Sequence, residues 1–197
     1  MERWVLLRKG ADFEAIGKKY QISPRLACLI RNRDVIGEEA IERYLNGTIS
    51  DLYDGMLMKD ADKAIDILKE KIAEEKKIRV IGDYDIDGVM STYILLESLR
   101  GLGCDVDMMI PNRITDGYGI NEHLIEQAWQ EGRDTIITCD NGIAAVTQIR
   151  KAKDLGMTVI VTDHHEVPFE DLEGERKEIL PPADAIVNPC LLYTSPS

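Results

Sequence analysis

No stretch of the 197-residue chain approaches the roughly 18 consecutive apolar residues that a membrane-spanning helix needs. Residues 1–8 carry Glu and Arg around a short apolar run and lack the length of a secretory signal peptide. Aromatic residues are few, at 6% of the chain, which leaves few rings on which nucleic-acid bases could stack. We therefore expect a cytoplasmic chain without a membrane segment.

Metal-binding cysteine pairs are also missing. Cys28, Cys104, Cys139 and Cys190 lie far apart and form no C-x-x-C pair, which excludes a zinc ribbon and argues against a disulfide framework. No G-x-G-x-x-G or Walker A loop follows the first predicted strand, so the common glycine-rich sites for nucleotide phosphates are excluded as well.

Positive charge is scarce. The chain has 24 Lys and Arg against 36 Asp and Glu, which gives a net charge of −12 and makes it a poor general binder of polyanions. The deficit is uneven, because residues 1–34 hold eight basic and only four acidic residues. An anionic partner could approach this basic end, although an ordinary solvated helix surface explains the same charges equally well.

The first third of the chain predicts helices. Ser23 followed by Pro24 is typical of a helix start, with Ser as the N-cap and Pro at the first helical position. Short helices are expected over 11–46, a loop over 47–58, and a longer amphipathic helix over 59–77.

A different pattern follows, in which short apolar runs alternate with helical segments. The runs lie at 79–81, 106–110, 135–139 and 157–161, with a candidate fifth at 185–187, and the helices at about 89–100, 121–131 and 143–154. Such alternation is typical of an α/β fold with a doubly wound, mostly parallel sheet covered on both faces. We predict a helical N-terminal region over 1–58 and a sheet domain over 59–189.

Polar side chains follow three of the predicted strands. They are Asp83, Asp85 and Asp87 after the first, Asp140 after the third, and Asp163, His164 and His165 after the fourth. The carboxyl ends of parallel strands share one edge of the sheet, where such folds bind their ligands. Carboxylates gathered there repel each other unless a cation offsets the charge, and oxygen with imidazole ligands suits Mg²⁺ or Mn²⁺. Two such ions could clamp a phosphate for in-line attack.

Two other interpretations remain open at this point. The run Asp85-Ile86-Asp87-Gly88-Val89 matches the nucleophile motif of haloacid-dehalogenase-type phosphatases, with Asp85 as the covalent nucleophile. That interpretation leaves the two histidines unexplained and lacks a later acidic pair. A metal-binding or receiver-like regulatory module would explain the acidic pocket but, again, not the histidines.

Taken together, the segments 83–88, 140–142 and 163–165 resemble motifs I to III of the DHH phosphoesterase family, named for the Asp-His-His triplet. The segments 111–113 and 117–119, with the helical lead-in, are similar to longer members that degrade single-stranded DNA. The resemblance implies a 5′-to-3′ exonuclease of DNA repair and recombination. Other members act on short oligonucleotides or cyclic dinucleotides, and these substrates remain the alternative.

The resemblance also implies a role for each residue. Asp83, Asp85, Asp87, Asp140 and His164 would bind two divalent cations, Mn²⁺ or Mg²⁺. His165 would lie near the scissile phosphate, Asp163 would orient an imidazole, and Arg113 and Tyr118 would bind substrate. Expected partners are single-stranded DNA and a single-strand-binding protein, with the chain itself a monomer.

The end of the sequence departs from the family pattern. The family has a further metal-binding Asp and a second domain downstream of the triplet, and neither fits into 197 residues. Residues 190–197 continue no pattern and resemble a translated sequencing adapter. We therefore expect the chain to be an N-terminal portion of a longer enzyme, with a non-native tail over 190–197. On its own, this portion should bind metal weakly and be nearly inactive.

Overall fold

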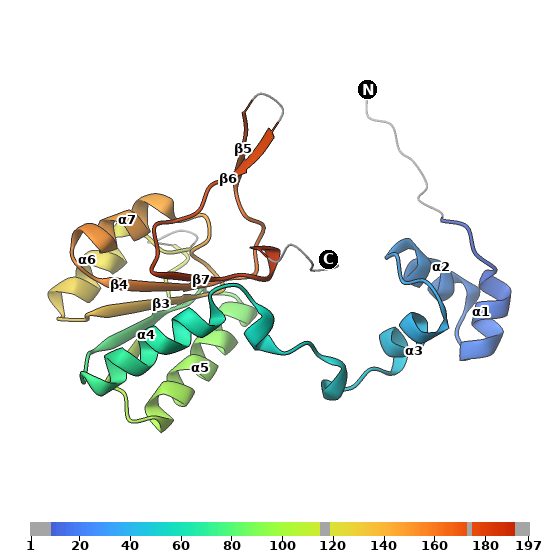
Figure 1. Ribbon diagram of the computed structural model, residues 1–197, viewed down its shortest axis with the longest axis horizontal. Coiled ribbons are helices and arrows are strands. Elements are labelled where there is room, and N and C mark those ends of the chain that lie inside the picture. The colour runs from blue at the N-terminus through green and yellow to red at the C-terminus, as the bar shows by residue number, and fades with distance from the viewer. Residues whose placement is uncertain (1–8, 115–118, 173–174, 192–197) are drawn as a thin grey trace. The chain divides into compact units, whose positions relative to one another are not determined.

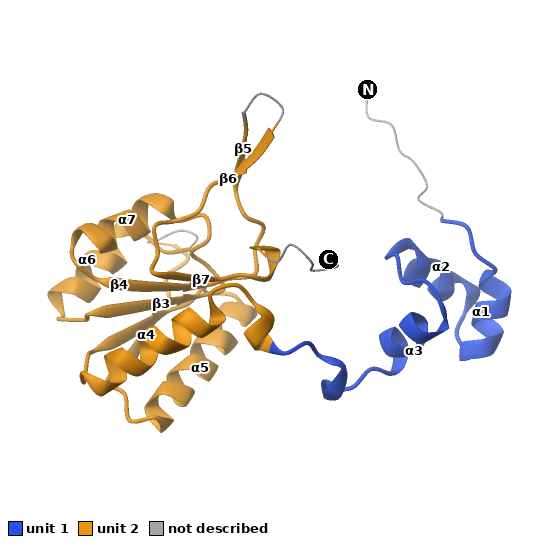
Figure 2. Cartoon of the chain, viewed as in Figure 1, with its two compact units in different colours: residues 1–54 blue, residues 55–197 orange. Residues whose placement is uncertain are grey.

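The computed structural model describes residues 9–114, 119–172 and 175–191. The chain forms two compact units, Met1–Asp54 and Gly55–Ser197 (Figure 2). The predicted boundary after residue 58 and the non-native tail stay predictions, and residues 192–197 of that tail lie outside the described residues. None of the described helices is long and apolar enough to cross a bilayer.

The first unit contains three short helices, as the sequence predicts. They are α1 (Phe13–Tyr20), α2 (Pro24–Asn32) and α3 (Glu38–Asn46), followed by the 3₁₀ turn η1 (Ile49–Asp51). The Ser23 hydroxyl accepts a hydrogen bond from the Leu26 N–H at 3.2 Å, which confirms the predicted cap. Among the residues described for this unit, the buried hydrophobic side chains are Ala27, Ile30 and Ile41.

The second unit is a five-stranded parallel sheet with helices on both faces (Figure 1). Its elements are η2 (Gly55–Leu57), α4 (Ala61–Ala73), β1 (Ile78–Ile81), α5 (Ile86–Gly101), β2 (Val106–Met109), α6 (Glu122–Gln130), β3 (Thr135–Cys139), α7 (Val146–Asp154), β4 (Thr158–Thr162), β7 (Ala185–Val187) and η3 (Pro189–Leu191). The strand order is β2-β1-β3-β4-β7, and every neighbouring pair is parallel. The predicted α/β fold, including the fifth strand, is confirmed.

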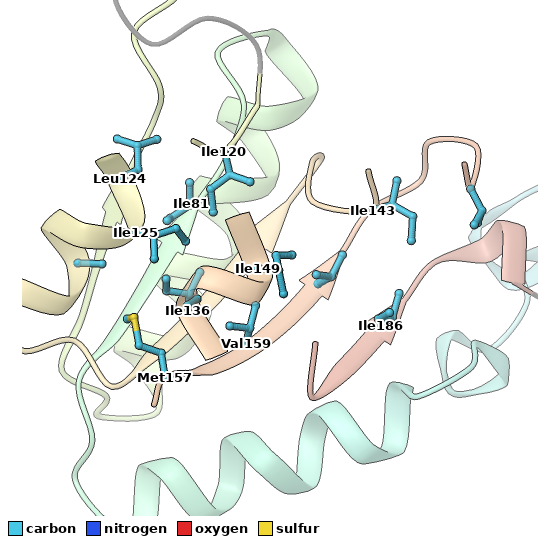
Figure 3. Packing of buried hydrophobic residues seen from close by; sticks show 14 residues of the cluster. Ile81, Ile120, Leu124, Ile125, Ile136, Ile143, Ile149, Met157, Val159 and Ile186 are labelled. Atoms are coloured by element: carbon cyan, nitrogen blue, oxygen red, sulfur yellow. The ribbon is translucent and has the colours of Figure 1, made fainter. Parts of the chain in front are cut away.

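Alternating side chains of the strands divide the core into two layers. Ile78 and Val80 of β1 pack on the side of α4 and α5, whereas Ile81 packs on the side of α6 and α7. Ile136 and Val159, from neighbouring strands, join Ile81 in the second layer (Figure 3). Because both faces of the sheet are buried, its strands read as continuous apolar runs.

The sequence pattern missed one feature, a two-stranded antiparallel hairpin between β4 and β7. It consists of β5 (Phe169–Leu172) and β6 (Glu175–Glu178) and projects from the sheet (Figure 1). The residues of β6 are all exposed and polar, so they carry no apolar periodicity. Arg176 lies over the ring of Phe169 at 3.8 Å.

Candidate metal centre

The loop between β1 and α5 holds the first group of carboxylates. Asp83 follows β1 and is completely buried, and Asp85 is the N-cap of α5, accepting hydrogen bonds from the N–H groups of Asp87 and Gly88 at 3.0 Å each. A Cβ atom at Gly88 would lie 2.4 Å from the Asp83 carbonyl oxygen. Only glycine therefore allows the loop to close tightly enough to bring Asp83 beside Asp85.

The loop after β3 places Asp140 opposite these residues. Asp140 has a left-handed backbone with a φ of 59°, which Asp tolerates better than most residues. The next glycine, Gly142, has a φ of 110°, and a Cβ atom there would lie 2.5 Å from the Thr138 hydroxyl. Between them, the Asn141 amide donates to the carbonyl of Ile81 at 3.4 Å, which joins this loop to the end of β1.

The loop after β4 is organised around Asp163. One carboxylate oxygen of Asp163 accepts hydrogen bonds from the N–H groups of His164 and His165 at 2.8 and 3.1 Å, and the other accepts from the Ile143 N–H at 2.9 Å. The first oxygen also lies 2.7 Å from Nδ1 of His165. This contact with the buried carboxylate raises the pKa of His165 above its ordinary value and fixes the orientation of the ring.

The three loops meet in two groups of side chains that could each hold a metal ion. One consists of Asp83, Asp85 and Asp140, the other of Asp140, His164 and His165, and within each group the ligand atoms lie within 4.8 Å of one another. Asp140 belongs to both groups, and one of its carboxylate oxygens lies 2.8 Å from Nε2 of His164. A carboxylate in this position can bridge two cations.

The charges of the site fit divalent cations. One carboxylate oxygen of Asp83 and one of Asp140 are buried and have no hydrogen-bond partner among the described residues. Burial and the neighbouring Asp85 carboxylate raise the pKa of Asp140, whereas the hydrogen bond from the Gly88 N–H lowers the pKa of Asp85. A cation ligated by these oxygens would satisfy the unpaired atoms and remove the repulsion.

Beside the histidines lies a cavity of about 350 Å³. Asp163, His165, Ile143 and Gln148 are among the residues that line it. Its size is at the lower end of the range for small-molecule pockets. His165 therefore belongs to a group of possible metal ligands and also lines an open space.

Not every predicted residue enters the two groups. Asp87 is exposed and belongs to neither of them, so its role as a ligand stays a prediction. His165, predicted to lie near the phosphate, lies among the residues that could hold a metal. Arg113 is exposed on the loop after β2, with its guanidinium 5.4 Å from the centre of the Tyr84 ring. Tyr118 lies outside the described residues.

Sequence reasoning missed the contribution of Asn188. Its side chain is fully buried after β7, donates to the carbonyl of His165 at 3.0 Å and accepts from the N–H of Cys190 at 2.8 Å. The Asp163 N–H, in turn, donates to the carbonyl of Val187 at 3.1 Å. A polar residue directly after the fifth candidate strand was the signal that could have identified it.

The fold and the site define a parallel α/β protein with side chains that could ligate metal ions at the carboxyl edge of its sheet. More specifically, the chain belongs to the DHH family, because the model of the DHH family N-terminal domain matches residues 77–197.

Curated relatives and solved structures resemble the chain over most of its length. The single-stranded-DNA-specific exonuclease RecJ of Bacillus subtilis is 38% identical over 95% of this chain and 23% of that protein. RecJ of Escherichia coli is 35% identical over 97% of this chain and 31% of that protein. A crystal structure of exonuclease RecJ bound to manganese superimposes with a TM-score of 0.62 at 33% identity, over 73% of this chain and 34% of that one.

RecJ of Thermus thermophilus in complex with Mn²⁺ has a TM-score of 0.64 at 27% identity, over 97% of this chain and 25% of that one. The chain thus spans roughly a quarter to a third of the length of these relatives.

Proposed function

We propose that the chain supplies the metal centre of a RecJ-type exonuclease that removes nucleotides from the 5′ end of single-stranded DNA. The observation that carries the proposal is Asp140, which is shared by two groups of possible ligands and keeps one buried oxygen without a partner among the described residues. The names of the curated relatives, which are single-stranded-DNA-specific exonucleases, support the choice of substrate.

In this proposal the first group, with Asp83 and Asp85, holds one divalent cation, Mn²⁺ or Mg²⁺, and His164 contributes to the second. Asp140 bridges the two sites, and Asp87 stays a proposed ligand although it is exposed. When bound, such cations neutralise the negative charge that develops on a phosphate during hydrolysis.

The remaining two residues of the triplet, Asp163 and His165, are proposed to act on the substrate phosphate. Asp163 holds Nδ1 of His165, which leaves Nε2 of that ring for the scissile phosphate or its leaving oxygen. Arg113 would bind a substrate phosphate through its guanidinium, because its N–H donors match two phosphate oxygens. Tyr118 stays a proposed substrate-binding residue.

The test is release of labelled nucleotide from 5′-labelled single-stranded DNA with Mn²⁺. The chain should be assayed beside a form extended downstream to the length of the relatives, in which we expect the activity to reside. His164→Ala should abolish release, whereas His123→Ala, an exposed histidine on α6, serves as the matched control. Calorimetric titration with Mn²⁺ should give two sites per extended chain.

Two results would contradict the proposal. Nucleotide release that persists in His164→Ala would show that the proposed metal centre is not needed for the reaction. Hydrolysis of short oligonucleotides or cyclic dinucleotides, with no release from long single strands, would leave the family assignment intact and replace the substrate.

We further propose a monomer that works in the cytoplasm with a single-strand-binding protein as partner. All four cysteines are free, which supports a reducing compartment. The partner rests on the proposed activity alone, since such proteins cover the substrate.

A further inference from the structure

Tyr84 lies at the junction of two loops that approach the metal centre from neighbouring strands. It stands between Asp83 and Asp85, and its N–H donates to the Asp83 carboxylate at 2.8 Å. Strands β1 and β2 run side by side, and the Gly82 N–H donates to the carbonyl of Met109 at 3.1 Å. The residues after β1 therefore lie next to those after β2, which lead to Arg113.

The contact between the two loops is a cation over an aromatic face. The guanidinium carbon of Arg113 lies 5.4 Å from the centre of the Tyr84 ring, within the roughly 6 Å at which this attraction operates. The Tyr84 side chain is half-buried, whereas Arg113 is exposed. Among the described residues, none forms an ion pair with Arg113.

This arrangement suits a phosphate-binding arginine for a geometric reason. Contact with a ring uses the flat face of the guanidinium, while its five N–H donors point outward in the plane. In that geometry the donors that would meet two phosphate oxygens would stay available. An ion pair with a neighbouring carboxylate would occupy those donors instead.

We propose that Tyr84 positions Arg113 to bind a phosphate of the substrate, so that the ring determines how tightly the single-stranded DNA is bound. The inference rests on the proposed function and extends it. In this role the ring acts through Arg113. Its removal should weaken binding of the substrate and leave binding of Mn²⁺ unchanged, because the Tyr84 N–H that donates to Asp83 belongs to the backbone and is kept in the variant.

The first experiment needs no substrate. The Nε–H resonance of Arg113, assigned by its disappearance in Arg113→Lys, should carry the upfield shift that an aromatic face imposes. Tyr84→Leu should abolish this shift, and Tyr84→Phe should keep it. Tyr93→Leu, which removes an exposed tyrosine from α5, is the matched control and should leave the resonance in place.

The second experiment measures binding of a 5′-phosphorylated oligothymidine with a 3′ fluorophore, with Ca²⁺ in place of Mn²⁺ to prevent hydrolysis. Tyr84→Leu should weaken binding about two- to fivefold, the range expected for loss of an exposed cation–π contact. Arg113→Ala should weaken it about tenfold or more, as for a charge-assisted hydrogen bond. In the Arg113→Ala background, Tyr84→Leu should have no further effect.

The outcomes separate the two proposals. An unchanged Arg113 resonance in Tyr84→Leu, additive effects in the double variant, or no binding by the unaltered chain would overturn the inference. Tyr84→Met, which fills similar space without an aromatic face, gives the same test if Tyr84→Leu does not fold. Binding that follows the expected pattern, without Mn²⁺-dependent hydrolysis in any form of the protein, would overturn the proposed function and support the inference.

Discussion

Acidic residues at the two ends of the parallel sheet differ in whether Lys or Arg side chains pair with them. At the amino end, Arg79 of β1 is 3% exposed and donates to both carboxylate oxygens of Asp107 at 2.8 and 2.6 Å. It also pairs with Glu131, and Arg133 pairs with Asp105 and Asp107. Each of these acids has a basic partner from a neighbouring strand or loop.

At the carboxyl end, no Lys or Arg of the described residues forms an ion pair with Asp83, Asp85 or Asp140, and the basic group beside Asp140 is Nε2 of His164 at 2.8 Å. Asp83 and Asp140 are buried, and one oxygen of each lacks a hydrogen bond within the same part of the chain. Asp85, the third member of the group, adds a further negative charge. The structure thus balances its charges where they hold strands together and leaves them unbalanced where a ligand is to bind. Substitutions at the two ends should therefore have opposite effects on stability.

The largest effect is expected for Asp140→Asn, at the carboxyl end. Loss of the shared ligand should reduce Mn²⁺ affinity at least about a hundredfold, since residues that only support a ligand already contribute roughly 10–100-fold. Without metal, the variant should unfold no more easily than the unaltered chain. The reason is that Asn tolerates the left-handed φ of 59° and removes a repelling charge.

Calorimetry with Mn²⁺ and urea unfolding in EDTA check the two parts of this prediction. A clear loss of stability in the metal-free variant would mean that other groups of the folded chain already compensate the negative charge of Asp140. The proposed contrast between the two ends of the sheet would then be wrong.

The next effect concerns the amino end. Arg79→Met should lower the free energy of unfolding by about 2–3 kcal/mol, because it leaves Asp107 and Glu131 without their shared partner. The loss should fall short of that for a fully buried pair, since the Glu131 side chain is 44% exposed. Urea unfolding measures the change, and Mn²⁺ affinity should stay as it was. A drop in Mn²⁺ affinity would show that the two ends are coupled.

The smallest effect is the dependence of stability on pH in the metal-free chain. Asp163 raises the pKa of His165, so this pair stabilises the fold below the ordinary histidine pKa of about 6.5 and loses that contribution as the pH rises through the raised value. Hydrogen bonds from Gln127 and Arg79 lower the pKa of Glu131, which therefore stabilises the fold above its ordinary pKa of about 4.3 and loses this as the pH falls.

Urea unfolding at pH 5.5 and 8.5 tests the sign for His165, and Glu131, whose carboxyl is ionised at both pH values, is the control. The stability difference between the unaltered chain and His165→Gln should be larger at pH 5.5, and below about 1 kcal/mol because water screens the half-exposed ring. The difference for Glu131→Gln should be similar at the two pH values. A stability difference for His165→Gln that grows with pH would show that the folded chain lowers the pKa of His165 and does not raise it.

The sequence determined the sheet and the positions of its strand ends. Strands buried on both faces are mostly apolar, so their approximate limits are visible without a structure. Asp140 and Asp163 follow β3 and β4 directly, and Asp83 follows β1 after Gly82. The prediction that these residues share one edge follows from parallel topology alone. The β5–β6 hairpin was not predicted because β6 is polar and exposed throughout and carries no such pattern.

Only the tertiary structure decided which of these residues come together. It joins Asp85 and Asp140 in one group and leaves Asp87 outside, although Asp85 and Asp87 look equivalent in the sequence. It also brings Asn188 to the backbone of His165 and Tyr84 to Arg113. A pattern along the chain fixes which edge of the sheet a residue lies on, whereas contacts between residues from different strands depend on loop conformations that only the packed fold sets.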